Sequence, residues 1–398
     1  MIFDVIVVGA GVVGLTLALE LGRAGLTVAV LEKQSLEYLN HPIDLSQYDK
    51  RVFTINSASQ ALFQSVGAWD GMQALRVSPY QSMEVWDACG SGEIQFNVDL
   101  GKFSELGHII EQKVILKALG DQLKYYDSIQ VIAPCELSHF TLSESVSNLY
   151  LKEEGGLKRL QTSLIVGADG ANSWVRTQAG LEVKGWSYGQ TALVATIHTE
   201  KSHGQTARQR FALEGPLALL PLADPHICSI VWMIDPLQAE NLAKMPAEEF
   251  SHILTRSFGP ALGALTLSED NRATFPLKMQ QATGYCQPGC ALVGDAAHVI
   301  HPLAGLGVNL GLQNVKVLSE FIKQQKDKQR MLGHFAYLKK YERQEKMRSR
   351  VVIAAMEGFK RGFGTDNSLV KHLRNAGLNL VDKQPLLKKW FVDFAMGK

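Results

Sequence analysis

The chain has 398 residues, of which 46% are hydrophobic and 20% charged, and its formal net charge is +1 at pH 7. This length exceeds one ordinary hydrophobic core and predicts two domains. The balanced charge gives no electrostatic basis for nucleic-acid binding. The five scattered cysteines predict neither a disulfide framework nor a metal site, and the N-terminus has no secretory signal, so we expect a cytoplasmic protein.

The first 32 residues have the pattern of a dinucleotide-binding βαβ unit. A short apolar run over residues 2–8 predicts a buried parallel strand. Three glycines follow with G-x-G-x-x-G spacing, namely Gly9, Gly11 and Gly14. They permit a tight turn, close approach of a pyrophosphate, and packing of the next helix on the strand. A second strand over 27–31 ends at Glu32, where a carboxylate can accept hydrogen bonds from a ribose.

After this unit the sequence predicts a surface segment followed by two helices. Residues 33–50 are polar and turn-prone, so we expect a surface excursion there. Arg51 can contact a cofactor phosphate or pair with a surface carboxylate, and the local sequence favours the second. A helix is expected to follow, with Ser57 as its cap, and another is expected over 106–119.

Two later motifs also carry polar residues at strand ends. An apolar strand leads into the turn 167–170, where Asp169 can face a ligand or cap the next helix. Another strand ends at Asp295, and the glycine-rich loop from Gly305 opens a long helix whose first N–H groups can face a ligand. His298 fits a core or capping role better than a catalytic one.

Between these motifs and after them the pattern changes. Residues 191–272 read as antiparallel strands with one helix near 247–258, which we interpret as an inserted substrate domain. The segments 378–381 and 390–392 can touch a membrane surface or belong to a docked C-terminal helix.

With these motifs the chain resembles the class A flavoprotein monooxygenases, and most of all the ubiquinone-biosynthesis hydroxylases. The segments that resemble this branch are 83–87, 106–111, 186–190, 215–222 and 373–378. Residues 192–196 and 224–232 resemble members that hydroxylate 2-polyprenylphenols at ring carbon 5. Three positions depart: the family usually has Gln at Leu306, Asp at Asn314 and Asn at Gln112.

The resemblance implies an α/β fold with a discontinuous architecture. It predicts a Rossmann-like FAD/NAD(P)-binding domain of the p-hydroxybenzoate hydroxylase type, with an inserted, mainly antiparallel substrate domain and C-terminal helices. The expected boundaries are 1–75, 101–180 and 275–345 for the FAD-binding domain, 76–100 and 181–274 for the substrate domain, and 346–398 for the helical region.

The resemblance also implies FAD as cofactor and NAD(P)H as a transient co-substrate. The implied cofactor-binding residues are Gly9, Gly11, Gly14, Glu32, Arg51, Gln112, Asp169, Asp295, Pro302, Gly305, Leu306, Gly307, Val308 and Asn309. Of these, Glu32 would bind the adenosine ribose, Arg51 and Gln112 the diphosphate and ribityl chain, and the loop from Gly305 the isoalloxazine. Asp169 is associated with both FAD and NAD(P)H.

The implied reaction adds one oxygen atom from O2 to the ring of a polyprenylphenol through a flavin 4a-hydroperoxide. His301 is the first side chain to consider for catalytic assistance. The apolar residues Phe211, Leu219, Pro221 and Trp232 can line a channel for the lipid tail or pack the domain core.

Two other functions stay open at this point. One is hydroxylation of a different small aromatic, and the other is non-catalytic binding of a prenylated partner on the same fold. Contact with other ubiquinone-pathway proteins, peripheral contact with the inner membrane and homo-oligomerisation are also left open.

Overall fold

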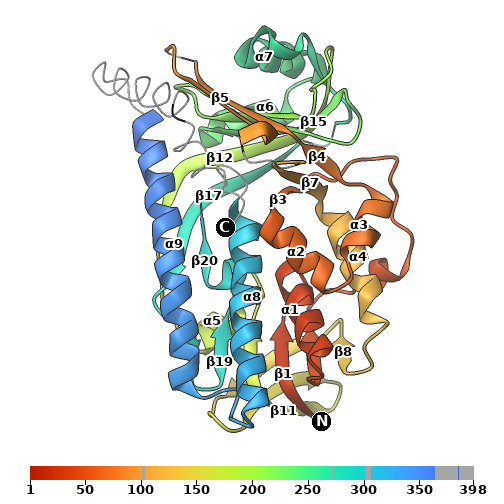
Figure 1. Ribbon diagram of the computed structural model, residues 1–398, viewed down its shortest axis with the longest axis vertical. Coiled ribbons are helices and arrows are strands. Elements are labelled where there is room, and N and C mark those ends of the chain that lie inside the picture. The colour runs from red at the N-terminus through yellow and green to blue at the C-terminus, as the bar shows by residue number, and fades with distance from the viewer. Residues whose placement is uncertain (89, 101–103, 271, 301–305, 364–383, 385–398) are drawn as a thin grey trace.

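The computed structural model describes residues 1–88, 90–100, 104–270, 272–300, 306–363 and 384. One part of the molecule is built on a mainly parallel sheet and the other on a large, mainly antiparallel sheet (Figure 1). A small antiparallel sheet of β3 (Val52–Ile55), β7 (Gly107–Glu111) and β4 (Ser78–Tyr80) lies between them. The expected α/β fold class is confirmed.

The mainly parallel sheet places the glycine motif at its centre. Its strands in spatial order are β18 (Cys286–Gln287), β19 (Cys290–Leu292), β11 (Gly156–Gly167), β1 (Ile2–Val8), β2 (Val28–Leu31) and β8 (Ile129–Ile132), with β10 (Ser147–Glu153) and β9 (Glu136–Thr141) continuing from β11. Five strands, β19, β11, β1, β2 and β8, run parallel, so their carboxyl ends share one edge. The glycine turn and the two later motifs follow β1, β11 and β19, which brings all three to that edge.

Helices cover this sheet. They are α1 (Val12–Arg23), α2 (Ser57–Ser65), α3 (Trp69–Leu75), α4 (Gln112–Leu123), α5 (Trp174–Gln178), α8 (Leu306–Asp327) and α9 (Phe335–Phe363). α8 and α9 pack along each other beside the sheet (Figure 1). Within the described residues, no helix has the length and apolar character that crossing a membrane requires.

Two local expectations were wrong. Residues 107–111 form strand β7 because they pair with both β3 and β4, and the helix begins only at Gln112. The cap of α2 is Asn56, whose side chain accepts a hydrogen bond from the Ser59 N–H at 2.9 Å, and Ser57 is the first helical residue. Asn is as good an N-cap as Ser, so the residue type alone could not choose between them.

The antiparallel sheet forms the part of the molecule that the sequence predicts to be the substrate domain, which we call the substrate part. Its strands in spatial order are β20 (His298–Val299), β17 (Ala273–Ala282), β12 (Val183–Thr199), β15 (Ile227–Ile234), β14 (Leu217–Pro221), β13 (Thr206–Phe211), β5 (Ser82–Asp87) and β6 (Glu93–Asn97), and β16 (Leu265–Leu267) pairs with β12. The β13–β5 pair is parallel. Short 3₁₀ turns occupy Glu37–Asn40, Val98–Leu100, Pro260–Leu262 and Gly294–Ala296.

The two faces of this sheet have different roles. α6 (Pro236–Lys244) and α7 (Ala247–Phe258) lie on its outer side (Figure 1), and their apolar residues form one buried cluster with alternate residues of β12, β14 and β15. The sequence had indicated only the second of these helices. The other face of the sheet points toward the nucleotide-binding part and leaves a cavity there.

Candidate cofactor and substrate site

The three motif glycines differ in what surrounds them. A Cβ at Gly9 would lie 2.5 Å from the Ala168 carbonyl oxygen, and Gly9 has a positive φ of 105°. A Cβ at Gly14 would lie 2.0 Å from the Gly9 carbonyl oxygen. A Cβ at Gly11 would meet no protein atom within 4 Å, because this residue lines the cavity. Gly9 and Gly14 are therefore required by packing, whereas the space at Gly11 is available to a ligand.

Glu32 lies beside the glycine turn. One carboxylate oxygen accepts a hydrogen bond from the Ala10 N–H at 2.9 Å, and the other accepts from the Gln34 N–H at 3.1 Å. Each carboxylate oxygen has a further lone pair, so these bonds leave acceptor capacity for a ribose hydroxyl.

The cavity has a volume of about 450 Å³ and extends from the glycine turn to the substrate sheet. Six of the residues expected to bind the cofactor line it, namely Gly11, Arg51, Gln112, Asp295, Gly307 and Val308. Five other expected residues do not line the cavity, namely Gly9, Gly14, Glu32, Asp169 and Asn309. His301, Pro302 and Gly305 lie outside the described residues, and Leu306 is the first residue of α8.

A carboxyl group and a guanidinium group, from Asp295 and Arg51, line the cavity at its nucleotide-binding end. Asp295 follows β19, and the surrounding protein raises the pKa of its carboxyl group, while the guanidinium of Arg51 acts in the opposite direction. The N-terminal ends of α1 and α8 also reach the cavity through Val12 and Gly307. Helix N-termini present free N–H groups and partial positive charge, which suits a diphosphate.

Asp169 supports the second turn through one of its two carboxylate oxygens. Its Oδ2 accepts a hydrogen bond from the Val175 N–H at 3.0 Å, whereas Oδ1 is buried and has no partner within the described part of the chain. Asp169 is not among the residues that line the cavity, although its neighbours Ala168 and Gly170 are, so the observed role of its side chain is to hold the turn against the start of α5. Arg176 donates to the carbonyl oxygens of Ala171 at 2.8 Å and Ala296 at 3.0 Å, which ties the second turn to the third.

Asn309 anchors the start of α8. Its Oδ1 accepts hydrogen bonds from the Asn56 N–H at 3.1 Å and the Ser59 hydroxyl at 2.7 Å. Its Nδ2 donates to the Thr54 carbonyl oxygen at 2.6 Å. The side chain thus fixes the helix N-terminus against β3 and α2, and it acts on the cavity through that placement.

A buried polar network holds the third turn. Asn314 Oδ1 accepts hydrogen bonds from the Gly294 N–H at 3.0 Å and from His298 Nε2 at 2.8 Å. Asn314 Nδ2 donates to Glu345 at 2.6 Å, and Glu345 also pairs with Arg348. The sequence had marked Asn314 as a departure from the family, and the carboxylate of this network comes from Glu345 on α9.

His298 makes folding sensitive to acid. Burial lowers its pKa to about 4 from 6.5, so the unfolded chain binds more protons than the folded chain between these values. Folding stability should therefore fall as the pH decreases from about 6.5 to 4, by about 3 kcal/mol from this group. His298→Gln retains a donor to Asn314 and should lose this part of the pH dependence. Urea denaturation at pH 7 and pH 4.5 measures it, and equal acid sensitivity of both proteins would contradict the assignment.

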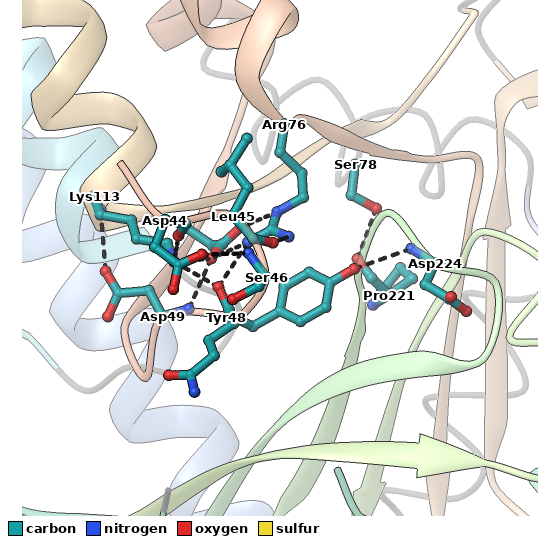
Figure 2. A network of polar contacts seen from close by, with 12 residues as sticks. Asp44, Leu45, Ser46, Tyr48, Asp49, Arg76, Ser78, Lys113, Pro221 and Asp224 are labelled. Carbon is teal, nitrogen blue, oxygen red and sulfur yellow. Dashed lines mark hydrogen bonds and ion pairs between the residues drawn. The ribbon is translucent and has the colours of Figure 1, made fainter. Parts of the chain in front are cut away.

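The segment before Arg51 is at the surface, as expected, and its second half is held by contacts of Leu45 and Tyr48 (Figure 2). Arg76 makes two hydrogen bonds to the buried Glu111 carboxylate, at 2.6 and 2.9 Å, and a third to the Leu45 carbonyl oxygen at 2.7 Å. Its guanidinium carbon lies 3.9 Å from the ring centroid of Tyr48. The Tyr48 hydroxyl oxygen accepts a hydrogen bond from the Asp224 N–H at 3.3 Å, which links this segment to the substrate part (Figure 2).

The Arg76–Glu111 contact predicts an unequal response of two arginines to truncation of their charge. Arg76→Met should cost about 3 kcal/mol of folding stability, because the buried Glu111 carboxylate then keeps only the Asp49 N–H at 2.7 Å and the Lys113 ammonium at 3.8 Å. The matched change Arg23→Met should cost less than about 0.5 kcal/mol, because Arg23 is 52% exposed and lies 3.8 Å from Glu20. Urea denaturation measures the stability of both variants, and similar losses would show that the Arg76–Glu111 contact stabilises the fold no more than an exposed ion pair does.

The four expected channel residues do not line the cavity. Leu219 and Trp232 are buried in the cluster under α6 and α7, on the outer face of the sheet. Pro221 points to that same face by strand alternation, and Phe211 packs in a separate cluster beside the cavity. The lining comes from the residues between them in sequence, which are Ala207, Gln209, Ala218, Leu220, Val231 and Met233.

The groups around the cavity fit FAD better than they fit a metal ion. Among the described residues, no three His, Cys, Asp or Glu side chains gather closely enough to hold a metal ion. The open space at Gly11, the Arg51 guanidinium and the two helix N-termini suit a dinucleotide.

Residues 3–352 match the family described as FAD binding domain, and the chain belongs to that family. FAD is therefore its cofactor, as expected from the sequence. The chain is 33% identical over 394 residues to the 3-demethoxyubiquinol 3-hydroxylase of Escherichia coli K12, covering 99% of this chain and 98% of the relative. It is 31% identical to the human mitochondrial ubiquinone biosynthesis monooxygenase COQ6, covering 99% and 92%.

Solved structures share the fold at lower identity. The p-nitrophenol 4-monooxygenase from Pseudomonas putida DLL-E4 superposes with a TM-score of 0.79 at 17% identity, covering 99% of this chain and 98% of that one. A ternary complex of aklavinone-11 hydroxylase with FAD and aklavinone superposes with a TM-score of 0.66 at 20% identity, covering 91% and 69%.

Proposed function

We propose that this protein is an FAD-dependent monooxygenase that uses NAD(P)H and O2 to hydroxylate the aromatic ring of a polyprenylphenol precursor of ubiquinone. The single observation that carries the proposal is a continuous cavity with a dinucleotide-binding end and an apolar end formed by the substrate sheet. Full-length relatives at 31–33% identity that are named as ubiquinone-pathway hydroxylases support the substrate class.

When bound, FAD supplies the redox chemistry and, with O2, the transferred oxygen. The protein supplies binding, orientation and exclusion of water. Gly11 and the first N–H groups of α1 would hold the diphosphate, and Arg51 would offset its charge. Asp295 and Gln112 would bind hydroxyl groups along the cofactor.

The apolar end of the cavity would hold the aromatic ring beside the cofactor and keep water away from it. Ile109, Leu220, Val231 and Met233 present apolar side chains there. An apolar wall suits a prenylated ring. It also excludes water from the reacting groups, which limits side reactions that would consume the reductant without hydroxylating the ring.

The test is an assay of the purified, FAD-loaded protein with NADPH or NADH, isotopically labelled O2 and a short-chain 2-prenylphenol. The expected result is a product that carries one labelled oxygen on the ring, whose position is read from its fragments. The Gly11→Val protein serves as a flavin-free control. Flavin that NAD(P)H never reduces would favour a non-catalytic prenyl-binding protein, and turnover of unprenylated phenols alone would indicate a different aromatic substrate.

A further inference from the structure

The apolar end of the cavity contains three polar side chains. Tyr80 comes from β4, and Arg208 and Gln209 come from β13. Their apolar surroundings are Met83, Ile109, Ala207, Ala218, Leu220, Val231 and Met233. A polar group in such a wall fixes the orientation of a ligand and distinguishes it from its analogues, provided that the group is free to bind.

Arg208 is not free. Its Nε donates to Glu84 at 2.8 Å, and its Nη1 donates to the His203 carbonyl oxygen at 2.8 Å. It also pairs across the sheet with Leu219, whose side chain belongs to the cluster on the outer face. The guanidinium therefore links β13 to β5 and lies on the outer face of the sheet, away from the ring site.

Gln209 is buried and has no partner. Its strand register pairs it with Ala218, and Ala218 lines the cavity, so the two side chains share the cavity face. Gln209 is only 6% exposed, and within the described residues its side-chain amide forms no hydrogen bond. The amide atoms of Gln209 are not among the fully buried polar atoms that lack a partner, so they are accessible from the cavity that this residue lines, and a ligand there can form hydrogen bonds with them.

Tyr80 adds a second free group to the same patch. Tyr80 and Leu220 both pack against the buried cluster that contains Ile109, and Leu220 lies on the same face of β14 as Ala218, the strand partner of Gln209. Burial raises the pKa of its phenol to about 12, so the hydroxyl stays protonated and can donate at neutral pH. In the described part of the chain this hydroxyl has no hydrogen-bond partner either.

We propose that Gln209 and Tyr80 bind the ring hydroxyl of the phenolic substrate and thereby select a phenol over the same ring without oxygen. The Gln209 carbonyl accepts the phenol O–H, and the Tyr80 hydroxyl donates to the phenol oxygen, so both are satisfied by one ligand atom. This assignment rests on the proposed function and adds the recognition of the phenol to it.

The experiment compares two ligands that differ only in the ring hydroxyl. FAD-loaded protein is titrated with 2-prenylphenol and with prenylbenzene, and the change in flavin absorbance gives each Kd. Wild-type protein should bind the phenol roughly tenfold more tightly, because the hydrocarbon leaves both groups unpaired. Gln209→Leu should lower this ratio to about threefold, because Tyr80 still donates to the phenol oxygen, and should change the Kd for prenylbenzene by less than about threefold. Tyr80→Phe should lower the ratio in part.

A matched control is Gln130→Leu, which removes an exposed amide from β8 and should leave the ratio unchanged. If Gln209→Leu does not retain flavin, Gln209→Met replaces it, because methionine has a similar shape without the amide. A wild-type ratio in the Gln209 variant overturns the inference, and so does a wild-type enzyme that hydroxylates the phenol yet binds both ligands equally. A wild-type protein that neither binds nor hydroxylates any prenylphenol refutes the proposed function itself.

Discussion

Replacing Gly11 by valine is expected to abolish FAD binding in a protein that still folds. Gly11 has φ −74° and ψ −177°, which any residue adopts, and a Cβ there meets no protein atom within 4 Å. The new side chain would occupy the space through which a pyrophosphate approaches the backbone. We expect a loss of at least about 3 kcal/mol in binding, or roughly 100-fold in the Kd for FAD. Fluorescence titration of the apoprotein with FAD measures it.

The matched control is Gly14→Ala, a smaller change in the same motif. A Cβ at Gly14 would lie 2.0 Å from the Gly9 carbonyl oxygen, so α1 would have to move away from β1. We expect the apoprotein to lose about 3 kcal/mol of folding stability or more. Gly11→Val apoprotein should instead unfold at the wild-type urea concentration. Wild-type FAD affinity in the Gly11 variant would show that the diphosphate binds elsewhere.

The glycine motif could be predicted from the sequence because its constraints are local. A strand, a turn and a helix within some 20 residues fix the places of Gly9, Gly11 and Gly14. Residues 107–111 show the opposite case. They look compatible with the helix that follows, yet they form β7 because β3 and β4, distant in sequence, pair with them. Strand formation depends on such partners more than on local preference.

The substrate face shows a second limit of the sequence. Alternation along β14 groups Leu219 with one face and Ala218 with the other, but it does not tell which face meets the cofactor. Of the two roles open to the larger side chains, Leu219 and Trp232 have the packing role, because α6 and α7 bury them on the outer face. The small residues Ala207 and Ala218 leave room for a ligand, and no pattern in the sequence marks them.

Asn314 provides the other large expected effect. Asn314→Asp should destabilise the protein by about 3–5 kcal/mol at pH 7, since it replaces the group that donates to Glu345 by a second buried carboxylate oxygen. The remaining oxygen still accepts from Gly294 and His298, so the conflict is confined to Glu345. Asn97→Asp, at an exposed position on β6, is the control and should change stability by less than about 0.5 kcal/mol.

The pH dependence identifies the cause. Burial already raises the pKa of Glu345. A second carboxylate raises it further, so a proton shared between the two acids relieves their repulsion when the pH is low. Because the folded-state pKa of the pair lies above the unfolded value, the variant's stability should decline as the pH rises through that folded-state pKa. Adding Glu345→Gln restores a donor to the new carboxylate and should recover most of the loss. Urea denaturation of the single and double variants at pH 5 and pH 8 gives the coupling energy, and additive losses would show that Asn314 and Glu345 do not interact.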